Sequence, residues 1–304
     1  MRTLIVLLSY VPYGESLKQH NMYILFDIGG TKTRIAGSRN GKVFTDPVIF
    51  KTPKKFQDGI RLFSDTAKKI AGKEKIVAAG GGFAGPLNAA KTSTINSPHL
   101  AGWVGKPLTN TLSRVMHAPV YIDNDTAIVG LGEAVAGAGQ GYDIVAYLTI
   151  STGVNGARIV NKHIDANAFG FEIGHQFIAP PDYHATHSCV SCPISGHLEG
   201  FISGSALEKK YHKKPHDITD KKIWSKTAQW LSFGLVNTAV YWSPHIIVLG
   251  GSMMKKPGID LAQVKKYFNS YLTIFPHKPR VVKAALGDIG GLYGGLALLK
   301  TIKR

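Results

Sequence analysis

Residues 23–44, YILFDIGGTKTRIAGSRNGKVF, contain the pattern that decides the fold. This pattern predicts an apolar strand, a Gly-Gly-Thr turn, a second strand, and an Asn-Gly hairpin that leads into a third strand. Residues 144–164, IVAYLTISTGVNGARIVNKHI, repeat the plan about 120 residues later around a Thr-Gly turn. Two such hairpins predict a duplicated architecture, in which two related domains face one another.

Strands and helices alternate through the rest of the chain. Strands that run into a glycine loop or a helix are predicted at 75–87, 118–137 and 244–254. Helices are predicted at 56–72, 223–242 and 289–303. This alternation predicts an α/β fold with largely parallel sheets flanked by helices. We expect a small domain at 22–125, completed by the last helix at about 291–304, and a large domain at 126–290.

The first 21 residues differ from the rest of the chain. Arg2 precedes an apolar run that ends at Tyr10 and Pro12, and the run is too short to span a bilayer. It resembles the apolar part of a signal peptide, but no small-residue cleavage site follows clearly. We therefore expect residues 1–21 to be an extension outside the folded core.

Composition limits the class of protein. The chain has 304 residues, of which 44% are hydrophobic, which is enough for a sizeable core. Two cysteines do not make a disulfide scaffold, so a reduced, cytoplasmic protein is expected. The net charge of +17 comes largely from scattered lysine pairs, a pattern typical of solvated helix faces. We expect no nucleic-acid partner and no membrane partner.

The two glycine turns are candidate phosphate sites. Glycine lets backbone N–H groups approach phosphate oxygens closely. Asp27 lies just before the first turn, where its carboxylate would face a metal–phosphate group, and the second turn contains Thr152, Gly153 and Gly156. Each turn by itself could also be an ordinary hairpin. The presence of two at equivalent places in a duplicated plan favours the phosphate interpretation.

Polar residues follow the strand at the end of YIDNDTA, residues 121–127. The carboxyl edge of an α/β sheet is where such folds bind ligands, and a phosphoryl acceptor needs a carboxylate to orient it and take its proton. Asp125 is the candidate base. A helix N-cap is the alternative interpretation, and it is the one we prefer for Asp123. Farther along, Glu172, His175 and Glu199 suit a polyhydroxylated ligand, since carboxylates accept hydrogen bonds from vicinal hydroxyls.

Seven motifs, in order, are similar to those of the ROK family of sugar kinases and related repressors. They are FDIGGTKT, FAGPLN, SPHLAGW, DND, STGVNGARIV, FEIGH and GHLEGFISGSAL, and the resemblance runs from about residue 22 to the C-terminus. It implies the actin-like ATPase (ribonuclease H-like) fold, in which two α/β domains close over ATP and a hexose in an interdomain cleft. It also implies Mg²⁺ and often a homodimer.

The resemblance implies roles for individual residues. The first phosphate motif matches Asp27, Gly29, Gly30, Thr31 and Lys32, the second matches Thr152, Gly153 and Gly156, and the adenosine-side turn matches Gly250 and Gly251. The sugar site matches Gly85, Asn124, Asp125, Glu172, His175 and Glu199, with Asp125 as the base.

Kinases of this family often carry a structural Zn²⁺ bound by the histidine of the EIGH motif and three cysteines. Here CVSCPISGHLE keeps that frame from Cys192 onward, with His197 at the third cysteine position and Cys189 displaced by one residue. We therefore expect a tetrahedral site of His175, Cys189, Cys192 and His197. The alternatives are His184 or His187 as the fourth ligand, a lost site, and a redox pair.

The sequence therefore predicts an ATP-dependent hexose phosphotransferase, with O6 of glucose as the first choice of acceptor. A kinase for fructose or an N-acetylhexosamine is an alternative, and polyphosphate is an alternative donor. A non-catalytic sugar sensor is a rival from another class. The family's repressors have a DNA-binding domain of roughly 60–80 residues, for which the first 21 residues leave no room.

Overall fold

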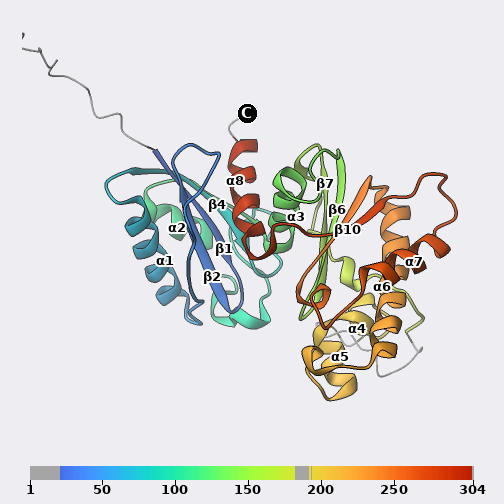
Figure 1. Cartoon of the computed structure of the whole chain (residues 1–304). Helices are drawn as coiled ribbons and strands as arrows, with labels where there is room; N and C mark the ends of the chain where they lie inside the picture. The colour runs from blue at the N-terminus through green and yellow to red at the C-terminus, as the bar shows by residue number, and fades with distance from the viewer. Residues whose placement is uncertain (1–20, 182–191, 193, 303–304) are drawn as a thin grey trace, which may run out of the picture.

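The computed structural model describes residues 21–181, 192 and 194–302, which form two five-stranded sheets with helices on both faces (Figure 1). The strands are β1 (Asn21–Ile28), β2 (Lys32–Ser38), β3 (Val48–Lys51), β4 (Lys75–Phe83), β5 (Val120–Asn124), β6 (Ile144–Ile150), β7 (Val154–Val160), β8 (His163–Ile164), β9 (Ile246–Gly250) and β10 (Arg280–Lys283). The helices are α1 (Phe56–Ala71), α2 (Leu108–Met116), α3 (Asp125–Ala136), α4 (Leu198–Ile202), α5 (Gly204–Tyr211), α6 (Lys221–Trp242), α7 (Leu261–Tyr271) and α8 (Gly290–Ile302).

The two sheets have equivalent topology. The first has the order β3-β2-β1-β4-β5, and the second has β8-β7-β6-β9-β10. In each sheet the first three strands of the chain pair antiparallel, and the two later strands pair parallel. The duplication predicted from the two glycine-turn hairpins is confirmed.

Alternation along the central strands builds a core on both faces of each sheet. In β1, Ile24 and Phe26 pack toward α1 and α2, whereas Leu25 packs toward α8. In β6, Leu148 packs toward α6, whereas Tyr147 packs toward α3. Successive side chains of a strand point to opposite faces, so a strand buried on both faces must be apolar throughout.

The helices α3 and α8 lie between the two sheets and pack on each other (Figure 1). Glycines permit this close crossing. A Cβ atom on Gly132 would lie 2.4 Å from the carbonyl oxygen of Gly290, and one on Gly294 would lie 1.8 Å from that of Ile128. The first residue of α3 is Asp125. The packing of α8 on α3 therefore helps to fix the position of the candidate base.

Two details of the first hairpin differ from expectation. The third strand begins at Val48, not directly after the Asn-Gly pair, because Asn40 Oδ1 instead accepts the N–H groups of Lys42 and Val43 at 2.8 and 3.1 Å. The first strand begins at Asn21, one residue before the expected start of the core. Residues 1–20 lie outside the described residues.

The α8 helix packs on β1 and β4 of the first sheet, as its assignment to the small domain requires. The domain boundaries at 22–125, 126–290 and 291–304 stay a prediction. Among the described helices, none has the length and apolar character to cross a membrane.

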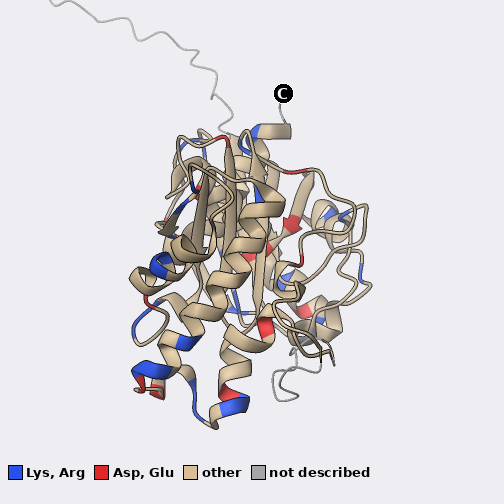
Figure 2. Cartoon of the chain, turned by 90° about the vertical axis from the view of Figure 1, so that its right-hand side faces the viewer, with Lys and Arg blue, Asp and Glu red and all other residues tan. Residues whose placement is uncertain are grey.

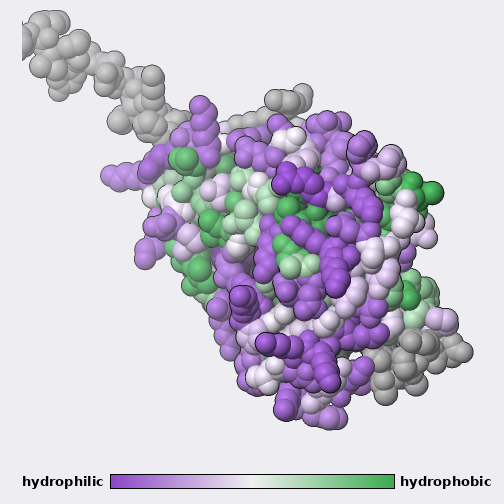
Figure 3. All heavy atoms as spheres, turned by 45° about the vertical axis from the view of Figure 1, so that its right-hand side comes forward, coloured by the Kyte–Doolittle hydropathy of each residue, from purple (hydrophilic) through white to green (hydrophobic). Residues whose placement is uncertain are grey.

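Lys and Arg residues are distributed over many elements of the second half of the molecule (Figure 2). A neighbouring view shows separate hydrophobic patches on a mostly hydrophilic surface (Figure 3). This distribution agrees with the interpretation of the lysine pairs as solvated surface.

Candidate active site

The first glycine turn joins β1 to β2. The N–H of Gly29 donates to the carbonyl oxygen of Lys32 at 3.0 Å, which closes the turn. Thr52 stabilises the turn with two hydrogen bonds. Its hydroxyl donates to the carbonyl oxygen of Gly29 at 2.7 Å, and its backbone N–H donates to the carbonyl oxygen of Thr31 at 2.9 Å. Thr31 and Lys32 are exposed, so their side chains can meet a ligand.

Gly30 contacts a residue whose role the sequence left open. A Cβ atom on Gly30 would lie 2.6 Å from Cβ of His99, in the SPHLAGW motif. Lys54 Nζ donates to the carbonyl oxygens of both Gly30, at 3.2 Å, and His99, at 2.6 Å. His99 therefore packs against the first glycine turn, and this contact requires glycine at position 30.

The second glycine turn, residues 151–153, joins β6 to β7 and lies against the start of α5. The N–H of Gly204 donates to the carbonyl of Ser151 at 2.7 Å, and that of Ser205 donates to the carbonyl of Thr152 at 3.2 Å. Thr152 is exposed at the tip of the turn. Its position suits the expected phosphate contact.

Gly156 does not belong to this turn. It is buried inside β7, and a Cβ atom there would lie 2.6 Å from the carbonyl oxygen of Tyr147 on β6. Close strand packing is enough to explain a glycine at this position, and the phosphate role expected for Gly156 stays a prediction.

The expected adenosine-side turn follows β9. Gly251 has φ +94° and a Cβ atom there would lie 2.1 Å from the carbonyl of Ile150, so the turn needs glycine. Gly250 is the last residue of β9, buried against the Tyr147 hydroxyl. A cavity of about 360 Å³ opens here, and its lining includes Thr152, Ser252, Lys255 and Lys256. The lining also includes Glu208, and a cavity with two lysines beside the second glycine turn suits a nucleotide.

Asn124 and Asp125 lie where β5 meets α3. Asn124 is the N-cap, since its side chain accepts from the N–H groups of Thr126 and Ala127 at 3.0 and 3.4 Å. The N-cap role that we preferred for Asp123 is therefore wrong, because the helix begins one residue later than that role requires. Asn124 also donates through Nδ2 to the carbonyl of Gly85 at 3.1 Å.

Asp125 and Asp27 are close enough to affect one another. Removal from bulk water raises the pKa of Asp125 to about 7, and the negative charge of Asp27 contributes to the rise. The pKa of Asp27 is also raised, chiefly by burial, and the Arg34 guanidinium opposes this effect. Arg34 Nη1 lies 3.2 Å from Asp27 Oδ2. A carboxyl group with a pKa near 7 is suited to act as a general base at neutral pH.

A narrow pocket of about 50 Å³ lies between the two halves of the molecule, beside Asn124 and Glu172. Its lining includes the polar side chains of Asn88 and Asn167 and the aromatic ring of Phe169. A pocket lined by both polar and aromatic side chains offers the kinds of contact that orient a polar small molecule. Gly85, whose carbonyl Asn124 contacts, has φ +121° and lies in the loop that forms one wall.

Lys91 and Asp123 form an ion pair in the lining of this pocket. Asp123 is buried, and its Oδ1 atom accepts the N–H of Asn124 at 2.8 Å. Lys91 has φ +52°, which is uncommon for a residue with a side chain. The pair therefore ties the loop to the strand end that carries Asn124.

Glu199 is buried at the start of α4, and it contacts the second glycine turn. Its Oε2 atom accepts the N–H of Val154 at 2.9 Å, and a Cβ atom on Gly153 would lie 2.7 Å from the same oxygen. Glu172 precedes a short 3-10 helix (Ile173–His175) and is exposed. Glu199 thus holds the start of α4 against the second glycine turn.

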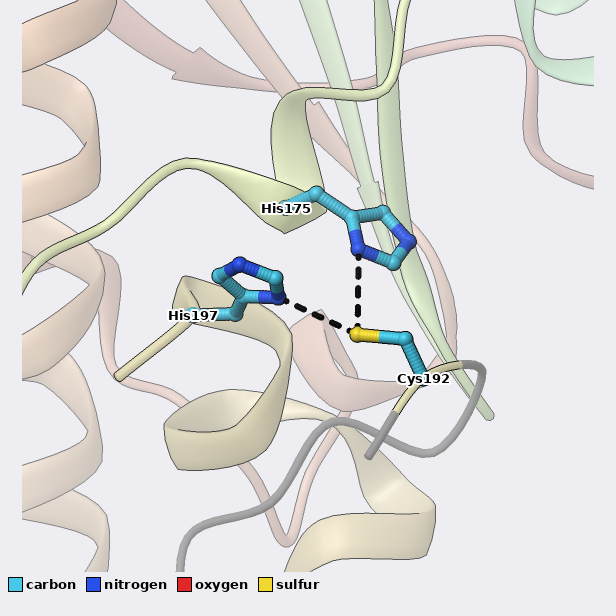
Figure 4. Close-up of side chains that lie close together, drawn as sticks. All are labelled: His175, Cys192 and His197. Carbon is cyan, nitrogen blue, oxygen red and sulfur yellow. Dashed lines mark hydrogen bonds between the residues drawn. The ribbon is translucent and has the colours of Figure 1, made fainter. Parts of the chain in front are cut away.

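His175, Cys192 and His197 form a cluster that could hold a metal ion (Figure 4). Cys192 Sγ lies 3.7 Å from Nδ1 of His175 and 3.4 Å from Nδ1 of His197. Two ligands at about 2.0–2.3 Å from a tetrahedral Zn²⁺ would be separated by roughly 3.3–3.8 Å, so the three donors fit this ion. Cys189, His184 and His187 lie outside the described residues.

Comparison with known proteins identifies the chain. Residues 23–302 match the ROK family. The chain belongs to this family. A protein of Bacillus subtilis named putative fructokinase is 29% identical over 90% of this chain and 93% of its own length. A glucokinase of Halalkalibacterium halodurans is 28% identical over 91% of this chain and 94% of its own length. This ROK protein is therefore a homologue of sugar kinases, which are phosphotransferases with an alcohol group as acceptor.

The fold of this ROK protein agrees with solved structures. The ROK hexokinase from Thermus thermophilus superposes with a TM-score of 0.81 at 23% identity, and the match covers 93% of this chain and all of the other. The protein has the actin-like ATPase fold expected from the motifs. At this identity the likeness shows the fold alone.

Sequence reasoning missed several contacts in this ROK protein. Arg34 pairs with Asp27 directly across the β1–β2 hairpin, a pairing that the register of the hairpin could have indicated. Lys91 reaches Asp123 from 32 residues away, so no local pattern could reveal it. Glu133, described below, was also missed.

Proposed function

We propose that this protein is an ATP-dependent hexose kinase in which Asp125 is the general base. The observation that carries the proposal is the position of Asp125. It begins α3 beside the Asn124 N-cap and the narrow polar pocket, its pKa is raised to about 7, and it lies near Asp27 of the first glycine turn. A base at this place can reach a hydroxyl held in the pocket and face a phosphate held by the turns.

The reaction follows from these positions. Asp125 accepts the proton of the sugar hydroxyl as that oxygen attacks the terminal phosphorus of ATP, the bond to the bridging oxygen breaks, and ADP leaves. The turns at 29–31 and 151–153 supply backbone N–H groups to the phosphates. Asn124, Glu172 and Glu199 orient the sugar, and catalysis of this kind depends mainly on positioning and charge stabilisation.

Mg²⁺ fits this arrangement because the half-buried carboxylate of Asp27 offers the hard oxygen ligand that the ion prefers, directly or through water. When bound, Mg²⁺ would neutralise phosphate charge. Arg34 would hold the Asp27 carboxylate in one orientation.

The acceptor that we propose is O6 of glucose, and the relative from Halalkalibacterium halodurans named glucokinase supports this choice. Fructose is the runner-up, supported by the relative from Bacillus subtilis. We also propose a structural Zn²⁺ held by His175, Cys192 and His197 with Cys189 as the fourth ligand, a homodimeric assembly, and action in the cytoplasm.

ADP release tests the proposal. Protein and Mg·ATP are mixed with glucose, fructose, N-acetylglucosamine, N-acetylmannosamine, or no sugar, and polyphosphate replaces ATP in a parallel series. We expect release that depends on glucose and on ATP. Release with another hexose would correct the acceptor, and a flat panel with ATP still bound would favour a non-catalytic sugar sensor.

A further inference from the structure

Glu133, on α3, is a carboxylate with almost no contact with solvent. Its side chain is 1% exposed, and it accepts three backbone N–H groups. Oε2 accepts from Ala138 at 2.9 Å and from Ala285 at 3.1 Å, while Oε1 accepts from Leu286 at 2.8 Å. Burying a carboxylate is costly, and charge-assisted hydrogen bonds of this kind offset the cost. Both carboxylate oxygens of Glu133 therefore accept hydrogen bonds from backbone N–H groups.

The segments that Glu133 joins are distant in sequence. Ala138 lies in the connection from α3 to β6, and Ala285 and Leu286 lie in residues 284–289, which connect β10 to α8. Figure 1 shows this second connection running from the sheet of β10 to α8. A Cβ atom on Gly137 would lie 2.1 Å from Glu133 Oε2, so the neighbouring turn leaves room only for glycine.

The connection fixed by Glu133 continues to the phosphate site. Asp288 Oδ2 lies 3.6 Å from Nη2 of Arg34, whose Nη1 contacts Asp27. At the start of α8, a Cβ atom on Gly291 would lie 3.1 Å from Cβ of Asp27. Leu286, which contacts Glu133, is therefore only five residues before Gly291, which packs against Asp27.

Glu133 is also connected to Asp125 through α3. Asp125 lies on α3 with Glu133, eight positions earlier, and an α-helix transmits position as a rigid rod over two turns. Gly132 contacts Gly290 at the crossing of α3 and α8, directly beside Glu133. Glu133 thus lies where the helix of one active-site carboxylate is attached to the segment that packs on the other.

We propose that Glu133 is a positioning residue for phosphoryl transfer. By holding residues 285 and 286 against α3, it sets the entry of α8 and hence the placement of Asp27 relative to Asp125. This inference rests on the proposed kinase function. We expect this role to affect kcat more than sugar binding, because Asn124, Glu172 and Glu199 lie outside the 284–289 connection.

Glu133→Gln tests the proposal. The amide keeps one acceptor oxygen but replaces the other by an NH₂ group, so at least one of the three N–H groups loses its partner. We expect kcat to fall about ten- to hundredfold, as small displacements of reacting groups cause, with the KM for sugar changed less than about twofold. Hydrogen exchange at the amides of 138, 285 and 286 should accelerate.

A control variant and a second test variant distinguish a specific effect of Glu133 from a general loss of stability. Glu74→Gln removes a carboxylate that pairs with Arg39 at 2.6 Å. Glu74 directly precedes Lys75, which pairs with Asn21 at the opposite end of β1 from the first glycine turn, so this variant should leave kcat unchanged. Leu286→Pro removes the backbone N–H that donates to Glu133 Oε1 and leaves Glu133 itself unchanged. Leu286 has φ −84°, which is close to the range that proline adopts. This variant should lower kcat without affecting the KM for sugar, even if Glu133→Gln does not fold.

The outcomes separate the two proposals. Unchanged kcat in folded Glu133→Gln, or equal loss of sugar binding and kcat, would overturn the positioning role. If the wild-type protein transfers no phosphoryl group, the proposed function fails, and so does the catalytic role of Glu133. Accelerated exchange at residues 285 and 286 would then show a contact that only supports the fold.

Discussion

Glu199, a residue of the expected sugar site, accepts a hydrogen bond at 2.9 Å from the backbone N–H of Val154, which directly follows the second glycine turn. The carboxylate also lies over Gly153, where a Cβ atom would be 2.7 Å from Oε2. One buried carboxylate therefore links two segments that are more than forty residues apart in the chain. We expect displacement of Glu199 to disturb both the start of α4 and the second glycine turn.

Substitution of Glu199 tests this connection. Glu199→Ala leaves the N–H of Val154 without its acceptor, and an unsatisfied buried donor costs about 1–3 kcal/mol of stability. We expect the KM values for sugar and for ATP both to rise, whereas Glu199→Gln, which keeps an acceptor oxygen, should chiefly raise the KM for sugar. Initial rates with each substrate varied, together with urea unfolding, provide the measurement. A change confined to the sugar in Glu199→Ala would contradict the connection.

The raised pKa of Asp125 predicts the pH dependence of turnover. A general base acts in its deprotonated form, so kcat/KM for the sugar should fall as the pH drops below about 7. Asp125→Ala should abolish turnover and leave sugar binding measurable by calorimetry. Retained turnover in this variant would show that another group takes the proton.

The same carboxyl group should lower the stability of the fold at neutral pH. The pKa of Asp125 is about 7 in the folded protein, against about 3.8 when unfolded. The unfolded chain therefore loses this proton first, and the wild-type protein loses stability as the pH rises from about 4 to 7. Asp125→Asn has no such proton, so its Tm should exceed that of the wild type increasingly across this window and by a constant amount above it. Thermal scans at pH 5, 6, 7 and 8 check this, and a difference that shrinks with rising pH would refute it.

The fold could be predicted because its signals are local. Apolar strands that end in glycine turns occur twice, and the two sheets have the same topology because the two hairpins are equivalent. Asp27 and Asp125 could be selected as candidates because Asp27 lies near the end of β1 and Asp125 directly follows β5. The sequence could not show that Gly156 lies within a strand, because a glycine required by strand packing and one required by a phosphate look the same in a sequence.

The remaining contacts depend on tertiary structure. Lys91 pairs with Asp123, His99 packs on Gly30, and Glu133 binds residues more than 150 positions away. In each case the residue type is compatible with an exposed, solvated position. Only the assembled fold shows that these side chains fix the loops around the site.

The His175, Cys192 and His197 cluster predicts a protein-bound metal. The Cys192 Sγ to Nδ1 distances of 3.4 and 3.7 Å match the separation of ligands around tetrahedral Zn²⁺. Protein purified without chelator should contain about one zinc per chain. Cys192→Ser should lose the metal and lower the Tm, and because His197 directly precedes α4, it should also raise the KM for sugar through Glu199.

Elemental analysis and thermal unfolding measure these effects. Replacement of the exposed His277 by Gln removes a histidine that lies outside the cluster, and it should change neither zinc content nor Tm. Zinc-free wild-type protein with the same Tm as protein incubated with Zn²⁺ would show that packing alone holds these three side chains together. Zinc retained by Cys192→Ser would instead place the ion elsewhere in the chain.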